Sequence, residues 1–239
     1  MTYNVHHGVG LDGRLSLERI AAVIAAQDPD IVALQELDVA RRRTGRVDQP
    51  ARLAELLRMQ HHFHPTVEVA REQYGTAVLS RWPMHKIRSG LLPTLHGRRL
   101  ENRAAIWVVV EVDGHPVQVV STHLGLLRAE RRLQAEALLG PDWLSHPDCA
   151  APRLLCGDLN MHAHGEIRCF NGVCVRAPWE VVGPPPRTFP SLLPLVAVDH
   201  IFFSEGLRLR AVHSPRDLGT RIASDHLPVI ASFELDAAA

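Results

Sequence analysis

The chain has 239 residues, which is enough for one large domain with a well-buried core. Hydrophobic residues make up 46% of the sequence and charged residues 22%, as in an ordinary soluble globular protein. The 26 Lys and Arg residues balance the 26 Asp and Glu residues, so the net charge gives no overall attraction to nucleic acid or to anionic lipid.

In the first half of the chain, helix and strand patterns alternate. Apolar residues at helical spacing, with Ser16 as a possible N-cap, predict the first helix, and Asp48 with Pro50 begins the second. Short apolar runs predict the strands, and Trp82-Pro83 ends the last of them. In chain order we expect a strand over residues 1–5, a helix over 16–27 and a strand over 31–34. A helix from Asp48 onward and a strand over 77–79 follow.

The second half begins with a predicted hairpin, in which Asp113-Gly114 is the turn. A helix over residues 128–139, a short strand over 154–156 and a proline-rich loop over 184–194 follow. We then expect two paired strands, over 198–203 and 207–213, and a closing strand over 228–235. No stretch resembles a linker, so we predict a single domain over residues 1–239. Strands and helices in mixed order, with hairpins, predict antiparallel or mixed sheets flanked by helices.

The cysteines indicate a cellular compartment. Only four are present, with no C-x-x-C pair, so a disulfide framework is not expected and a reducing, cytoplasmic location is. No apolar run approaches the ~20 residues that span a bilayer, and no signal-peptide pattern opens the chain, so we expect no transmembrane segment. Only three residues precede Asn4, which leaves open whether Met1 is the natural start.

Polar side chains recur directly beside the predicted strands. Burying such a group without a partner costs a few kcal/mol, so its position needs a reason, and metal binding or catalysis is one. The residues concerned are Asn4, Gln35, Glu36, His123, Asp158, Asn160, Asp199, His200, Ser224, Asp225 and His226.

The kinds of side chain in this set favour a particular metal. Carboxylate and amide oxygens are the ligands that Mg²⁺ or Mn²⁺ prefers, and no Cys-His cluster indicates zinc. Asp199 and His226 together offer a base with an orienting carboxylate. The oxygen donors that we expect to converge are Asn4, Glu36, Asp158, Asn160 and Asp225.

Each motif alone also has a purely structural explanation. Asn4 could cap a turn, Gly157-Asp158 is a common turn dipeptide, and Asp199 or Asp225 could cap a neighbouring segment. The run Arg41-Arg42-Arg43 with Arg46 is the first candidate for a local basic patch, but a solvated loop is the favoured interpretation. The occurrence of all the polar motifs in one chain favours function over these explanations.

Seven segments resemble, in sequence order, the motifs of the endonuclease/exonuclease/phosphatase superfamily. The resemblance covers essentially the whole chain and is nearest to small bacterial members of unassigned substrate. The segments are residues 2–8, 34–36, 74–81, 121–124, 157–160, 198–201 and 224–228.

The resemblance implies a fold and a chemistry. The fold is an α/β four-layer α/β/β/α sandwich, with two mixed β-sheets packed face to face. The activity is hydrolysis of a phosphodiester or phosphomonoester with Mg²⁺, or Mn²⁺, assisting the attack of water. The zero net charge and the aromatic content of only 5% favour a small-molecule or lipid-derived substrate over the alternative, a DNA or RNA nuclease. An inactive binding module ranks below both, because no expected catalytic position is missing. The number of metal ions and the oligomeric state stay open.

Residue roles are also implied by the resemblance, one position at a time. Asn4, Glu36 and Asp225 match metal-binding positions. Asp158 and Asn160 match the pair that orients water and the scissile phosphate, and His226, held by Asp199, matches a base or transition-state stabiliser. His123 matches a phosphate contact or a leaving-group acid, and Arg103 a phosphate-binding arginine. Gly75-Thr76-Ala77 departs from the Gly-Asn-Ala of several relatives, so an amide contact to substrate is in doubt.

The proline-rich segment is predicted to affect substrate size. Five prolines between Pro184 and Pro194 predict a stiff loop, because proline fixes φ and lacks the N–H donor. Since the loop precedes Asp199, we expect it near the site, with Phe189 as an apolar wall and Arg187 as a phosphate contact. The alternative is a surface connection with Phe189 in the core.

Overall fold

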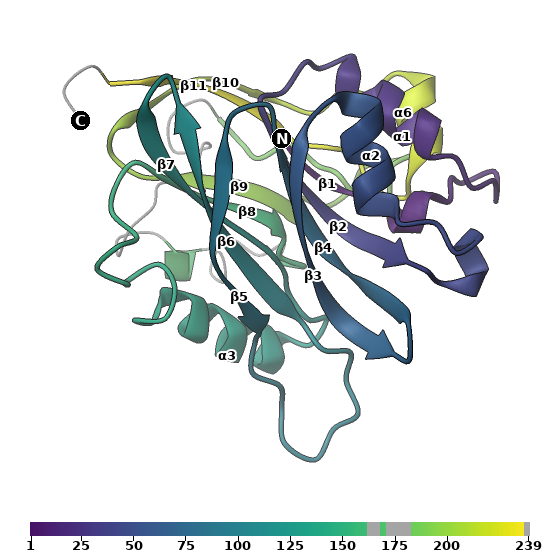
Figure 1. Cartoon of the computed structure of the whole chain (residues 1–239), viewed down its shortest axis with the longest axis horizontal. Helices are drawn as coiled ribbons and strands as arrows, with labels where there is room; N and C mark the ends of the chain where they lie inside the picture. Colours follow the sequence, from purple (N-terminus) through teal and green to yellow (C-terminus); the bar gives the residue numbers. More distant parts are fainter. Residues whose placement is uncertain (162–167, 171–182, 237–239) are drawn as a thin grey trace.

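The computed structural model of the chain describes residues 1–161, 168–170 and 183–236. Its strands form two large mixed sheets and a separate hairpin (Figure 1). The first sheet has the order β1-β2-β4-β3, with β1 (Thr2–Asn4), β2 (Ile31–Val39), β3 (Gln60–Val69) and β4 (Glu72–Ser80). The second has the order β5-β6-β7-β8-β9, with β5 (Met84–Leu91), β6 (Ala104–Val112), β7 (His115–His123), β8 (Arg153–Asp158) and β9 (Asp199–Phe203).

The remaining described elements are the hairpin and short helices. The hairpin pairs β10 (Leu207–His213) with β11 (Ile230–Leu235), and Val229 just before it bonds to Thr2 at the edge of the first sheet. The α-helices are α1 (Leu17–Ala25), α2 (Gln49–Leu57), α3 (Arg128–Leu139) and α6 (Leu218–Ala223). The 3₁₀ turns are η1 (His6–Gly8), η2 (Arg42–Thr44) and η3 (Arg168–Phe170).

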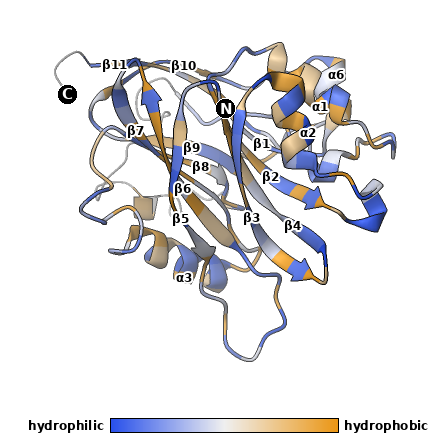
Figure 2. Cartoon of the chain, viewed as in Figure 1, coloured by the Kyte–Doolittle hydropathy of each residue, from blue (hydrophilic) through white to orange (hydrophobic). Residues whose placement is uncertain are grey.

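Three apolar clusters hold the layers together. One lies between the sheets and joins Ala33 and Val78 of the first to Ile106 and Val119 of the second. A second joins α1 and α2 to the outer face of the first sheet, and a third joins α3 to the outer face of the second. Figure 2 shows hydrophobic residues along the strands and on the helices that cover them. The expected α/β/β/α sandwich is confirmed.

Local signals account for the helix starts. The Ser16 hydroxyl accepts from the Arg19 N–H at 3.1 Å, and the Asp48 carboxylate accepts from the Ala51 N–H at 3.0 Å, so each satisfies a donor that the first helical turn leaves free. The third helix has the predicted bounds, 128–139. Pro184–Pro194 contains no helix or strand, apart from a single bridge between Phe189 and Val196.

One expectation about strands was wrong, and two strands were not predicted. Residues 198–203 and 207–213 do not pair with each other: β9 pairs with β8 inside the second sheet, and β10 pairs with β11. Strands β3 and β5 were not predicted. Both lie at sheet edges and have many half-exposed polar residues, so neither shows the apolar run that marked the central strands.

The parallel strand pairs determine where the site can form. Strand β1 runs parallel to β2 in the first sheet, and β7 runs parallel to β8 in the second. Asn4 is therefore level with Gln35, and His123 is level with Asp158. The polar residues that follow the strands consequently gather at the carboxyl ends of two facing sheets.

Two further features concern membrane-spanning helices and cysteine thiols in the described part of the chain. No helix there is long and apolar enough to cross a membrane. Cys156 has a free thiol. Cys174 lies outside the described residues.

Gly157 allows β8 to approach β7 closely. Its φ is 153°, and a Cβ atom there would lie 1.9 Å from the carbonyl oxygen of Thr122. Because that neighbour is backbone, it cannot move aside as a flexible side chain could. We expect Gly157→Ala to lower the free energy of unfolding by about 3 kcal/mol or more, measured by urea denaturation.

Gly90→Ala is the matched control for this prediction. Gly90 lies in the same sheet, and a Cβ atom there would have nothing within 4 Å. We expect a change within about 0.5 kcal/mol. Equal effects of the two substitutions would refute the steric explanation.

Candidate active site

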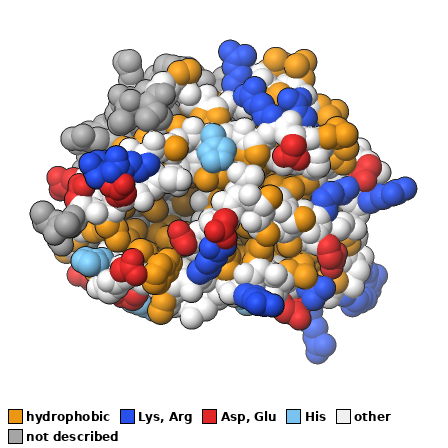
Figure 3. All heavy atoms as spheres, turned by 90° about the horizontal axis from the view of Figure 1, so that it is seen from above, with side chains coloured by type: hydrophobic (Ala, Val, Ile, Leu, Met, Phe, Trp, Pro, Cys, Tyr) orange, Lys and Arg blue, Asp and Glu red, His pale blue; other side chains and the backbone are white. Residues whose placement is uncertain are grey.

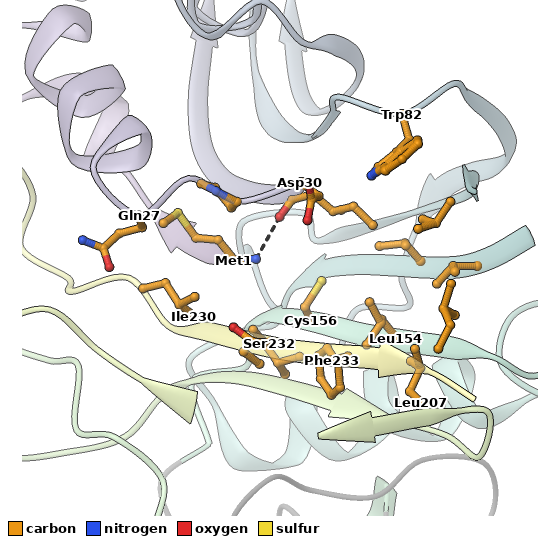
Figure 4. Close-up of a pocket in the computed structure, with 18 of the residues that line it drawn as sticks. Met1, Gln27, Asp30, Trp82, Leu154, Cys156, Leu207, Ile230, Ser232 and Phe233 are labelled. Atoms are coloured by element: carbon orange, nitrogen blue, oxygen red, sulfur yellow. Dashed lines mark hydrogen bonds between the residues drawn. The ribbon is translucent and has the colours of Figure 1, made fainter. Parts of the chain in front are cut away.

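Two hollows distinguish the two ends of the sandwich. The first, of about 230 Å³, lies at the amino ends of β1, β2 and β8, where the Met1 amine donates to Ile31 O at 2.8 Å (Figure 4). Its lining is mainly hydrophobic. The second hollow, a cleft of about 630 Å³, lies at the carboxyl ends of the same strands and is lined by most of the predicted site residues. Figure 3 shows one face of the molecule, on which hydrophobic side chains gather near the centre between charged ones.

The amide of Asn4 joins two carboxylates from different sheets. Its Nδ2 donates to Glu36 Oε1 at 2.9 Å and to Asp158 Oδ2 at 3.0 Å, while its Oδ1 accepts from the His6 N–H at 3.1 Å. Asn4 is fully buried, so its position is fixed by these bonds. Glu36 and Asp158 therefore lie within two hydrogen-bond lengths of each other.

A β-bulge in β2 positions Glu36. The pairing with β4 shifts between Leu34 and Leu37, where the register partners are Ala77 and Gly75, so β2 has one extra residue. Glu36 has a φ of 62°, which non-glycine residues rarely adopt. Bulges commonly redirect a side chain next to a site, and here Glu36 lines the cleft.

His226 is held by Asp199. The distance from His226 Nδ1 to Asp199 Oδ2 is 2.9 Å, and His226 Nε2 lies 3.7 Å from Asp158 Oδ2. Burial disfavours the charged imidazolium, but the charge and hydrogen bond of Asp199, with Asp158 and Asp225, outweigh it and raise the pKa of His226 to about 10. His226 is thus an imidazolium near neutral pH.

His123, unlike His226, is uncharged. Arg103 Nη1 lies 3.1 Å from His123 Nδ1, and Asn160 Nδ2 lies 3.3 Å from His123 Nε2. Burial, followed by the positive charges of Arg103 and His226, lowers the pKa of His123 well below its usual value. His123 is therefore a neutral imidazole beside a fixed guanidinium.

The loop after β8 fixes Asn160. The Asn160 N–H donates to Asp158 Oδ1 at 3.0 Å, and its side-chain amide donates to Leu124 O at 2.9 Å. Asn160 has a φ of 52°, a conformation that asparagine tolerates better than most residues. Gly157 and Asp158 are thus the last residues of β8 and not a turn, and Asp158 both holds the Asn160 backbone and lines the cleft.

The site has features that suit a divalent cation. Asp158, Asp199 and His226 offer ligand atoms that all lie within 4.8 Å of one another. Burial, followed by the charge of Asp199, raises the pKa of Asp158 to about 7, so a nearby cation would stabilise its charged form. The buried Asp199 Oδ1 has no hydrogen-bond partner among the described residues. With Glu36 beside them, these oxygen donors fit Mg²⁺ or Mn²⁺.

The other predicted residues lie at different distances from the cleft. Phe189 is 36% exposed, lines the cleft and packs against the His226 ring at a centroid distance of 4.9 Å, so it is not part of the core. Asp225 is half-buried, and Ser224 donates to its carboxylate at 3.3 Å. Arg187 is exposed and does not line the cleft. The roles of Asp225 and Arg187 stay predictions.

Sequence reasoning missed part of the cleft lining. Arg41 and Arg43, interpreted as a solvated loop, line it together with Tyr74, His6 and His7. A signal was present for the arginines: they follow the strand that contains Glu36, as the other polar residues follow theirs.

The chain is similar over nearly its whole length to known proteins. The sequence model described as "Endonuclease/Exonuclease/phosphatase family" matches residues 1–226. An uncharacterized protein of Escherichia coli, YbhP, is 26% identical, with 98% of this chain and 95% of that protein covered.

Solved structures have the same fold. An endonuclease/exonuclease/phosphatase from Beutenbergia cavernae has a TM-score of 0.76 at 25% identity, covering 99% of this chain and 71% of that one. A mannosyl-6-phosphatase from Bacteroides thetaiotaomicron has a TM-score of 0.78 at 17% identity, covering 98% of both chains.

The His226–Asp199 pair generates a prediction about protonation. Because the carboxylate of Asp199 favours the charged imidazole, Asp199→Asn should lower the pKa of His226 by about 1–3 units from its value of about 10. NMR titration of the imidazole in metal-free protein measures this. A pKa for His226 that is unchanged by the substitution would contradict the assigned pairing.

Proposed function

The chain belongs to the endonuclease/exonuclease/phosphatase family, and we propose that it is a metal-dependent hydrolase of phosphate esters. The observation that most supports this function is the convergence of Glu36 and Asp158 on the Asn4 amide, beside the His226–Asp199 pair. Such an arrangement can hold a cation next to an imidazolium at the bottom of an open cleft. That residues 1–239 form one domain stays a prediction.

The cation would be held mainly by Glu36. Asp158 lies on the other side of the Asn4 amide. Asn4 and Asp225 stay predicted members of the metal site, although the Asn4 amide hydrogens, and not its oxygen, face the two carboxylates. When bound, the cation would act as a Lewis acid on a phosphate oxygen and stabilise charge on the leaving oxygen.

The protein residues would position and stabilise the reacting groups. Asp158, with Asn160, would orient the attacking water, and the water proton would pass to the Asp158 carboxylate. His226 would donate from Nε2 to a non-bridging phosphate oxygen, with Asp199 keeping the ring charged and oriented. Positioning and electrostatic stabilisation of this kind account for most of the catalysis in phosphoryl transfer.

His123 and Arg103 would contact the scissile phosphate from the second sheet. A neutral His123 is a poor proton donor, so we propose a phosphate contact for it and not a leaving-group acid. The Arg103 guanidinium is buried, and its Nε has no partner among the described residues. A buried N–H of this kind beside a cleft is expected to bind an anion.

A small or lipid-derived ester is the favoured substrate. Phe189 narrows the cleft next to His226, and the net charge of zero gives no general attraction to nucleic acid. We propose that duplex DNA fits this cleft poorly.

The metal proposal predicts a strict requirement for Mg²⁺. The protein should hydrolyse bis(p-nitrophenyl) phosphate with Mg²⁺ and lose this activity in EDTA. Glu36→Gln should lower kcat/KM by about a thousandfold, because the amide removes a negative ligand. The readout is p-nitrophenolate release.

Glu72→Gln is the matched control for this test. Glu72 is a partly exposed carboxylate at the start of β4 and does not line the cleft, so its replacement should change kcat/KM by less than about threefold. Unchanged activity of Glu36→Gln would refute the metal assignment. No activity on any phosphate ester would favour the inactive binding module.

The loop proposal predicts a specific effect of Phe189. Because Phe189 packs against His226 and lines the cleft, Phe189→Ala should lower kcat/KM for the small phosphodiester by at least about tenfold, which is ~1.4 kcal/mol. Steady-state kinetics measure the effect. Arg187→Ala is the comparison, since Arg187 is exposed and outside the cleft lining. A comparable loss with Arg187→Ala would support its predicted phosphate contact.

Plasmid DNA provides the second half of this test. We expect slow or undetectable cleavage of duplex DNA by the unmodified protein. Efficient cleavage that does not change with Phe189→Ala would place the nuclease alternative first.

A further inference from the structure

Two arginines line the cleft on the side of the first sheet. Arg41 directly precedes the 3₁₀ turn η2, and Arg43 lies within it. Both follow Glu36 by a few residues and line the same cleft as Asp158 and His226. Arg103 lies on the side of the second sheet, just before β6, and is 3.1 Å from His123. The cleft therefore has arginine side chains on both sides, and only Arg103 belongs to the centre described above.

Arg43 is bound at two points within the protein. Its Nε and Nη2 donate to the two oxygens of Asp38 at 2.7 and 2.8 Å, and the Asp38 side chain is completely buried. Such a two-point bond is strong and directional. Arg43 thus neutralises Asp38 and is not the group that meets a ligand.

Arg41 is held less tightly by its neighbours. Its nearest carboxylate oxygens, on Asp38 and Glu72, are each 3.9 Å away, which is beyond hydrogen-bonding distance. Asp38 already binds Arg43, and Glu72 also lies 3.8 Å from Arg42. The Arg41 side chain is nevertheless only 27% exposed, so it is a largely desolvated cation without a close anionic partner among the described residues.

The ring of Tyr74 holds this cation in place. The Arg41 guanidinium carbon lies 5.9 Å from the ring centroid, within the range of a cation–π contact, and Arg43 lies 5.5 Å from the same centroid. Tyr74 is itself only 7% exposed and lines the cleft. Arg41 is consequently oriented before a ligand arrives, which lowers the entropy cost of binding one.

We propose that Arg41 binds a second anionic group of the substrate, separate from the phosphate that is cleaved. Identifying the cleft ligand as a substrate rests on the proposed function. The substrate class that follows is a phosphate ester with a further phosphate, or a group of similar charge, on the part of the molecule that extends toward the first sheet.

Alkyl phosphonates test this subsite without any reaction, because their C–P bonds are not ester bonds. The probes are monophosphonates and α,ω-bisphosphonates of equal chain length, from propane to hexane, titrated in Mg²⁺ by calorimetry. For at least one chain length, the unmodified protein should bind the bisphosphonate at least about tenfold more tightly than the monophosphonate. No preference at any length would overturn the proposal.

Arg41→Ala should remove the preference and change monophosphonate affinity by less than about twofold. Arg42→Ala is the matched control: Arg42 is in the same turn, is 80% exposed and does not line the cleft, so the preference should remain. Arg43 is not substituted, because that would leave the buried Asp38 charge unpaired. An unchanged preference in a folded Arg41→Ala protein, checked by circular dichroism, would overturn the subsite.

The binding measurement tests the subsite independently of catalysis. A protein that prefers bisphosphonates through Arg41 but hydrolyses no phosphate ester would refute the proposed function and leave the subsite intact. A protein that hydrolyses esters but shows no Arg41-dependent preference would refute the subsite and leave the proposed function intact.

Discussion

The rest of the site depends on one buried amide. Asn4 donates to Glu36 from the first sheet and to Asp158 from the second, so two carboxylates that would repel each other are held at a fixed spacing. Because these partners belong to different layers, the bonds also set how the carboxyl ends of the two sheets meet. The apolar cluster between the sheets provides the cohesion, and Asn4 provides the alignment.

The fold could be predicted from the sequence as far as strong local patterns reached. The helix over residues 128–139 and the hairpin around Asp113-Gly114 were correct because apolar spacing and turn residues agreed there. The edge strands β3 and β5 were missed because their half-exposed residues give a weak pattern. The partner of β9 is β8, over forty residues earlier by number, and local patterns contain no information about such a pairing.

The site could be predicted as a set of residues but not as a set of charges. The sequence identified Asn4, Glu36, Asp158 and His226, and the structure brings them together, although their roles stay predictions. That His226 is charged and His123 neutral depends on whether Asp199 or Arg103 is the neighbour, which only the tertiary structure decides. Arg41 was misjudged for the same reason, since a run of arginines looks alike whether it faces solvent or a cleft.

The bulge in β2 has an evolutionary consequence. Side chains alternate between the faces of a strand, so removing the extra residue between Leu34 and Leu37 would move Glu36 away from the cleft. The chain length of this stretch thus fixes the position of Glu36, whereas the turn after β2 can lengthen or shorten without disturbing it. Relatives that differ in substrate should therefore accumulate insertions and deletions after Val39, while the nine-residue length of β2 stays the same.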